Sequence, residues 1–192
     1  MNRLIIIGAG GHGKVVEDAA NTPCVFLDED STRCGVIGTP SELASIIEEG
    51  DGVVVAIGDN KRRSELLLEV DTLTTVIHRS ATISDGAIIE EGCVVFANAV
   101  VNTGATLQRG CIINTGATVD HDCKLAECVH ISPGANLGGN VEVGNCSWVG
   151  IGACVKNGVT IGKHVIIGAG AAVVSDVPDN TTVVGVPAGN IK

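Results

Sequence analysis

The chain has 192 residues, enough for one ordinary domain or two small ones, and its formal net charge is −10. This acidity argues against nucleic acid or an anionic membrane surface as a partner. The hydrophobic fraction is 45%, but no apolar run approaches the roughly 20 residues that cross a bilayer, and the start MNRLIIIGAGG lacks a signal-peptide cleavage region.

The first part of the chain, residues 1–76, alternates short apolar runs with amphipathic segments. Strands are predicted over 3–7, 24–27 and 53–57, and helices over 11–20, 41–49 and 60–69. This βαβαβα order is typical of half a Rossmann fold with a parallel sheet. Arg62 and Arg63, on the third helix, are expected on a solvated charged face.

Gly8, Gly10 and Gly13 spell GxGxxG after the first strand. The spacing is formally a dinucleotide-binding motif, but the α/β pattern stops before residue 77 and leaves no second half to hold a nicotinamide. We therefore expect no NAD site. Glycines still let the backbone approach a ligand, and N–H groups at the start of a helix favour anionic oxygens.

Residues 77–192 follow a different rule, because every sixth residue from Ile77 to Val173 is Ile, Val or Leu through seventeen hexads. The fifth position of each hexad is small or short, as in Ala81, Ala87 and Cys93. A strict period of six fits neither a strand nor a helix, and it predicts an all-β parallel β-helix built of triangular coils. Three hexads make one coil, so residues eighteen apart should stack.

The eight cysteines fall on this same lattice, since Cys93 and Cys111, like Cys128 and Cys146, are eighteen residues apart. We interpret them as small apolar fillers in a reducing, cytoplasmic protein. No CxxC pair supports a metal site, and His121, His130 and His164 do not stack as in the solenoid carbonic anhydrases. We predict that no metal is bound.

Asp120, His121 and Asp122 stand together in a solenoid that is otherwise poor in charge. Acyl transfer from a thioester needs a base near neutrality, which histidine can provide, and an adjacent carboxylate can orient the ring and raise its basicity. The stacking rule places Gly139 one coil above His121, where a bare backbone N–H can stabilise an oxyanion. Cys123 occupies the inward fifth position, so a covalent role for it is disfavoured.

The hexads, together with NTGATVDHDC, HISPGANLGGNVEVG and GVPAGN, resemble the hexapeptide-repeat acyltransferases. Within that group, IIIGAGGHGKVV and AIGDNKRR are similar to the sugar O- and N-acetyltransferases of the sialic-acid and bacillosamine type. The resemblance covers almost the whole chain. It implies a left-handed coil, acetyl-CoA as donor and a homotrimer with sites between neighbouring solenoids.

The resemblance also implies site residues. His121 would be the general base and Asp122 its orienting partner, although Glu is frequent at the second position. The acceptor, a nucleotide-linked sugar, would lie against the front domain, and its residues there are Gly10, Gly11, His12, Asp28, Glu29 and Gly58. The acetyl-CoA arm would meet His130, Gly139, Ile151 and Ala169. Asn114, which stacks with Ser132, is a further candidate for lining the cleft.

Three lysines, Lys156, Lys163 and Lys192, are candidates for the CoA phosphates, with solvated side chains as the alternative. The family's tail has Lys or Arg after GxPA, whereas Gly189 follows Ala188 here, so that contact is not assigned. His130 lies nine residues from His121, half a coil away, and the two could meet only across a subunit boundary.

We predict an acetyl-CoA-dependent N-acetyltransferase that acts directly on the 4-amino group of a nucleotide-linked 4-amino-4,6-dideoxy sugar, with UDP as the expected nucleotide. The enzyme alternative is O-acetylation of a sialic-acid-like sugar, which needs the same base and donor. The alternative that is not an enzyme is a β-solenoid scaffold module, against which the His–Asp pair argues.

Overall fold

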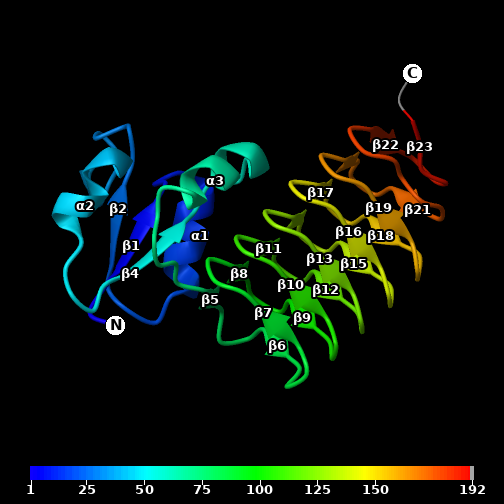
Figure 1. Cartoon of the computed structure of the whole chain (residues 1–192), viewed down its shortest axis with the longest axis horizontal. Coiled ribbons are helices and arrows are strands. Elements are labelled where there is room, and N and C mark those ends of the chain that lie inside the picture. Colours follow the sequence, from blue (N-terminus) through cyan, green and yellow to red (C-terminus); the bar gives the residue numbers. More distant parts are fainter. Residues whose placement is uncertain (191–192) are drawn as a thin grey trace.

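The computed structural model describes residues 1–190, so Lys192 lies outside the described residues. Figure 1 shows an α/β domain followed by a stack of short strands that runs from the green to the red part of the chain. The predicted fold class, a half-Rossmann domain followed by a left-handed parallel β-helix, is confirmed. The longest helix in residues 1–190 has nine residues, fewer than the roughly 20 that cross a membrane.

The front domain is a four-stranded parallel sheet of order β3-β2-β1-β4 with short helices. Its elements are β1 (Leu4–Ile7), α1 (Gly11–Ala19), β2 (Cys24–Leu27), β3 (Val36–Gly38), the 3₁₀ turn η1 (Pro40–Glu42), α2 (Leu43–Ile46), β4 (Gly52–Val55) and α3 (Asn60–Leu67). The central strands β1 and β4 are buried along their whole length, which explains their continuous apolar runs.

Two features of this domain differ from the prediction. The edge strand β3 was missed because three residues are too few to show a period. The helix expected over 41–49 is a 3₁₀ turn, begun by a capping box between Thr39 and Glu42, and then a single turn of α2. It ends where Ile47 adopts an extended backbone, and Gly50, at φ 89°, leads the chain into β4.

The remaining strands form three parallel sheets, the faces of a triangular prism. Face 1 contains β5 (Val76–Ile77), β8 (Val94–Val95), β11 (Ile112–Ile113), β14 (His130–Ile131), β17 (Trp148–Val149), β20 (Ile166–Ile167), β22 (Thr182–Val184) and the antiparallel β23 (Gly189–Asn190). Face 2 contains β6 (Thr82–Ile83), β9 (Val100–Val101), β12 (Thr118–Val119), β15 (Asn136–Leu137), β18 (Cys154–Val155) and β21 (Ala172–Val173). Face 3 contains β7 (Ile88–Ile89), β10 (Thr106–Leu107), β13 (Lys124–Leu125), β16 (Glu142–Val143) and β19 (Thr160–Ile161).

The predicted stacking of residues eighteen apart is confirmed, as in the pairs His130 with Trp148 and Thr118 with Asn136. From Val95 onward the aliphatic hexad positions are buried in one continuous core, together with the small fifth positions. The regular coil ends near the C-terminus, where Ile166 pairs with Thr182, sixteen residues on.

The cysteines fill space in two places. Cys93, Cys111 and Cys123 are fully buried inside the prism, as predicted. Cys128 and Cys146 instead lie at the edge between faces 3 and 1, where they pack against the front domain. All eight cysteines are free.

The front domain covers only the first coils of face 1. Val76, Val94 and Ile112 share a buried cluster with α1 and the sheet, and Phe96 completes it. Of the next outward residues on this face, His130 is still buried and Trp148 is exposed at the margin of that cover. The junction between the two domains therefore ends where the face becomes accessible.

Candidate functional site

His121, an exposed histidine of the solenoid, lies in the turn between β12 and β13, at the edge where faces 2 and 3 meet. Its Nδ1 is 2.8 Å from Asp122 Oδ2. With Nδ1 donating to the carboxylate, Nε2 keeps its lone pair, as a base requires. The hydrogen bond that Nδ1 donates to the Asp122 carboxylate raises the pKa of His121.

The turn that carries this pair is held by Asp120. Its Oδ1 accepts hydrogen bonds from the His121 N–H and from Asn102 Nδ2, each at 2.8 Å. Asp122 has a φ of 58°, a left-handed conformation that Asp and Asn tolerate better than most side chains. This conformation fits a short carboxylate next to the histidine.

Gly139 lies directly against the His121 ring, as the stacking rule predicted. A Cβ at Gly139 would sit 2.4 Å from His121 Nε2. Within residues 1–190 the Gly139 N–H donates to no acceptor, whereas the next N–H, of Asn140, bonds to the His121 carbonyl at 2.9 Å. The arrangement brings a basic nitrogen beside an unpaired backbone donor.

A cavity of about 500 Å³ opens where the front domain meets face 1. The front domain contributes Gly11, His12, Val15, Gly58 and Asp59, and the solenoid contributes Phe96, Asn114, His130 and Trp148. We call this cavity the junction pocket. It brings together five residues that the sequence analysis selected: Gly11, His12, Gly58, Asn114 and His130.

The hydrogen bonds of Asn114 determine the protonation state and the tautomer of His130. Asn114 Oδ1 accepts from the Thr115 N–H at 2.8 Å, so its Nδ2 donates to His130 Nε2 at 3.1 Å. His130 is therefore neutral with its proton on Nδ1, and this nitrogen has no partner in residues 1–190. His12 Nε2 is also buried and unpaired. Two buried imidazole nitrogens are thus left for a ligand.

The rings of this pocket pack against one another in two pairs. His130 and Trp148 are parallel, with centroids 5.4 Å apart, and His12 packs edge-on against Phe96 at 5.3 Å. Burial, the charge of Arg63 and the neighbouring His12 lower the pKa of His130 to about 3, and burial and Arg63 lower the pKa of His12 to about 4. The junction pocket therefore presents neutral imidazoles at physiological pH.

Asp28 and Glu29 line a second, smaller cavity of about 90 Å³ at the carboxyl edge of the sheet, with Gly8 and Arg62. Asp28 also has a structural role, because its Oδ2 accepts from the Ala9 N–H at 2.7 Å and pairs with Arg33 at 3.2 Å. A Cβ at Gly10 would contact that same arginine. The predicted acceptor-binding residues are thus divided between this cavity and the junction pocket.

Ile151 and Ala169 are exposed and stack on the edge between faces 1 and 2, just after β17 and β20. Neither backbone N–H donates to an acceptor in residues 1–190. This edge therefore offers two main-chain donors on successive coils.

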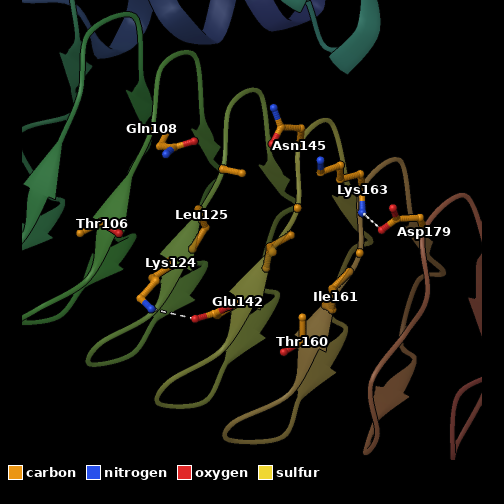
Figure 2. Close-up of a pocket in the computed structure, with 14 residues that line it drawn as sticks. Thr106, Gln108, Lys124, Leu125, Glu142, Asn145, Thr160, Ile161, Lys163 and Asp179 are labelled. Carbon is orange, nitrogen blue, oxygen red and sulfur yellow. Dashed lines mark hydrogen bonds and ion pairs between the residues drawn. The ribbon is translucent and has the colours of Figure 1, made fainter.

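Another groove, of about 400 Å³, runs over face 3 and is shown in Figure 2. Lys124 and Glu142 pair across it at 2.8 Å, and the Lys163 N–H donates to Asp179. Of the residues singled out from the sequence, only Lys163 lines it.

Comparison with known proteins gives the family. Residues 3–70 match the model of the PglD N-terminal domain. The acetyltransferase domain of PglB from Neisseria gonorrhoeae FA1090 is 44% identical, with a TM-score of 0.95 and 100% of both chains covered. The chain belongs to the PglD-type N-acetyltransferases.

Two further members of this family carry informative names. PerB from Caulobacter crescentus, solved with CoA and GDP-perosamine, is 38% identical over 100% of this chain and 98% of that one, with a TM-score of 0.95. The UDP-N-acetylbacillosamine N-acetyltransferase of Bacillus subtilis (strain 168) is 37% identical over an alignment of 113 residues, which covers 50% of this chain and 52% of that relative. This match thus spans about half of the curated relative.

One prediction about the front domain was wrong. Arg63 does not lie on a solvated face; its side chain is 1% exposed at the junction of the two domains, whereas Arg62 pairs with Glu65 near the surface. The helix period did not reveal this, because the burial of Arg63 comes from the solenoid corners that α3 meets.

The sequence also left four residues of the junction pocket unassigned: Val15, Trp148, Phe96 and Asp59. Trp148 was recoverable, since it is the only tryptophan and stands eighteen residues after His130. Phe96 and Asp59 had no such signal, because their place depends on how the front domain docks.

Replacing Gly139 by Ala should strongly lower turnover without unfolding the protein. The new methyl group would displace the exposed His121 ring, while the Gly139 backbone has no positive φ that an alanine would strain. We expect the thermal midpoint to change little while kcat falls at least tenfold. An active Gly139→Ala protein would show that the ring position is unimportant.

The buried histidines should make the protein less stable in acid. A folded-state pKa below the usual 6.5 means that the unfolded chain binds protons that the folded chain refuses, so stability falls as pH drops from about 6.5 toward 4. At pH 5 each histidine should cost roughly 2 kcal/mol relative to pH 8. Thermal midpoints at both pH values should therefore differ less in His130→Gln than in the wild type; an equal difference would contradict the assignment.

Proposed function

We propose that this chain transfers the acetyl group of acetyl-CoA to the amino group of a nucleotide-linked amino sugar. The observation that carries the proposal is the His121–Asp122 pair, with a free Nε2 next to Gly139, whose N–H is unpaired within residues 1–190. The relatives' names support it, since one is named for N-acetylation of a UDP sugar and others were solved with acetyl coenzyme A or with CoA and GDP-perosamine.

In the proposed reaction the sugar amine attacks the thioester carbonyl while His121 Nε2 takes the amine proton. The carbonyl oxygen becomes an oxyanion that the Gly139 N–H stabilises. The carbon–sulfur bond then breaks, and the imidazolium returns the proton to the CoA thiolate. Each step uses a group that the solenoid already holds in place, and no acetyl-cysteine forms, because the Cys123 thiol points inward.

For the acceptor we propose the 4-amino group of a UDP-linked 4-amino-4,6-dideoxy sugar. Gly10, Gly11 and His12 would meet its diphosphate or sugar, and Asp28 and Glu29 its nucleoside, because carboxylates accept N–H and hydroxyl donors. Gly58 and Asn114 would line the cleft. The names of the relatives favour a nitrogen rather than the hydroxyl of a sialic-acid-like sugar.

For the donor, we propose that the acetyl-CoA arm lies along the edge between faces 1 and 2, against the main chain of Ile151 and Ala169. His130 would donate its Nδ1 proton where the acetyl end meets the acceptor. The eight free cysteines support a reducing, cytoplasmic location.

The two halves of this site lie apart in one chain. His121 is on the edge between faces 2 and 3, which is the edge opposite face 1, whereas the junction pocket opens on face 1. A triangular prism cannot turn both toward one substrate. We propose that the site is shared between subunits of a homotrimer, each contributing one half to each of its neighbours.

The geometry also suggests which face points inward. If face 2 faces a threefold axis, the edge with His121 of one subunit meets the edge with Ile151 and Ala169 of the next. The outward row of face 2 carries no charge, as an interface core requires. That row consists of Thr82, Val100, Thr118, Asn136, Cys154 and Ala172.

The function is tested by replacing the base and its partner. His121→Ala should lower kcat by about 10²–10⁴-fold with the fold intact. Asp122→Asn should cost less, and it should move the acidic limb of the rate profile to lower pH, because an amide raises the pKa of His121 less than a carboxylate does. Cys123→Ala is the matched control and should stay active. Near wild-type turnover by His121→Ala would refute the proposal.

The shared site is tested by mixing two inactive chains. His121→Ala lacks the base, and Gly11→Trp fills the junction pocket at a position where an added side chain meets open space. In randomly reassembled trimers about one interface in four should combine an intact base with an intact pocket. Co-refolding should therefore restore about a quarter of wild-type activity. Activity that stays at the level of the separate variants would place the whole site in one chain.

A further inference from the structure

Arg63 is a buried cation without a buried anion. Its guanidinium makes hydrogen bonds only to neutral oxygens: Gly110 O, Cys128 O and Ile57 O at 2.8 Å, Asn60 Oδ1 at 2.7 Å and Gly58 O at 3.3 Å. Within residues 1–190 it forms no ion pair. Burying a charge without an opposite charge costs free energy, which the hydrogen bonds of the guanidinium must offset.

The partners of Arg63 belong to two different structures. Ile57 and Gly58 follow β4, and Gly58 belongs to the front-domain wall of the junction pocket, whereas Gly110 and Cys128 are successive corners of the solenoid. Asn60 extends the same connection, because its Nδ2 donates to the carbonyls of Cys146 and Ser147 at 3.1 Å. One planar guanidinium thus joins the pocket's front wall to the body that carries its other wall.

The other wall contains His130, two residues after Cys128. The backbone of Gly58 lies near enough to His130 to influence its pKa, without completing a hydrogen bond to Nδ1. Arg63 thus bonds to the Gly58 carbonyl on one wall and to the Cys128 carbonyl, two residues before His130, on the other. The positive charge of Arg63 also acts on both pocket histidines and favours their neutral forms.

We propose that Arg63 is a positioning residue for the acceptor, which fixes the distance between the Gly58 wall and the His130 wall of the junction pocket. This inference rests on the proposed function and adds the device that keeps the acceptor half of the site assembled. Arg63 does not touch substrate; it acts through the carbonyls that it holds. Lysine cannot replace it, since one ammonium cannot reach five acceptors in a plane.

Arg109 provides a matched control. It also bridges the solenoid to α3, through a hydrogen bond to Leu67 O at 3.4 Å, and it is held within the solenoid by an ion pair with Glu91 at 2.9 Å, but it does not line the junction pocket. Arg109→Lys therefore disturbs the same domain junction without moving a pocket wall.

The experiment compares Arg63→Lys with Arg109→Lys in the full chain. We expect Arg63→Lys to raise the KM for the nucleotide amino sugar about tenfold or more, while the KM for acetyl-CoA stays within about twofold. Arg109→Lys should change neither. A purely structural role would lower the folded fraction, and hence kcat, and leave both KM values alone. Unchanged or equally raised KM values in Arg63→Lys, or the same shift in Arg109→Lys, would overturn the inference.

A second variant covers the case in which Arg63→Lys does not fold. Asn60→Ala keeps the arginine and removes one of its acceptors, so it should raise the acceptor KM in the same selective way by a smaller factor. Equal effects on both substrates would count against the inference.

A binding assay separates this inference from the proposed function. Trp148 is the only tryptophan and lines the junction pocket, so its fluorescence can report titration with UDP or GDP as the probe. If the wild type acetylates no nucleotide amino sugar, the proposed function fails, and weaker nucleotide binding by Arg63→Lys than by Arg109→Lys would still support the inference. Equal binding by the two variants, or a wild type that binds neither nucleotide, would contradict it.

Discussion

The backbone ladder between successive coils determines the rest of this molecule. Each strand pairs in parallel with the strand eighteen residues later, so a side chain has one neighbour above and one below that the sequence names in advance. Inside the prism this register stacks aliphatic and small residues into a core. Outside, it places Gly139 against His121 and Trp148 against His130. The chemistry of the surface is a consequence of the same hydrogen bonds that stabilise the fold.

The three site histidines show how different surroundings give one side chain different tasks. His121 is exposed beside a carboxylate, which favours the imidazolium and makes the ring a stronger base. His12 and His130 are enclosed near a buried guanidinium, and both effects oppose protonation. A single chain therefore offers a proton acceptor on one edge and uncharged hydrogen-bonding rings on the opposite face.

The sequence predicted the solenoid almost completely, because a period of six over seventeen hexads leaves little freedom. It also predicted the His121, Asp122 and Gly139 cluster, since that cluster depends only on the coil register. It failed where two domains meet. The burial of Arg63, the place of Phe96 and the distribution of Asp28 and Gly58 between two cavities all depend on docking, which no local pattern records. The short strand β3 was lost for a different reason, because three residues carry too little periodic information.

The repetition of the coil has a consequence for how such a site can change. Neighbouring strands lie about 4.8 Å apart, so the spacing along the prism axis between equivalent surface positions on different coils is a whole number of these steps. The length of an acetyl-CoA arm that contacts Ile151 and Ala169 thus corresponds to a certain number of coils. Inserting or deleting eighteen residues would lengthen or shorten the groove by one step while keeping every inward side chain inward, whereas a shift of one residue would exchange core and surface. The length of the groove for the acetyl-CoA arm can therefore change only in steps of one coil, through insertions or deletions that preserve the coil register.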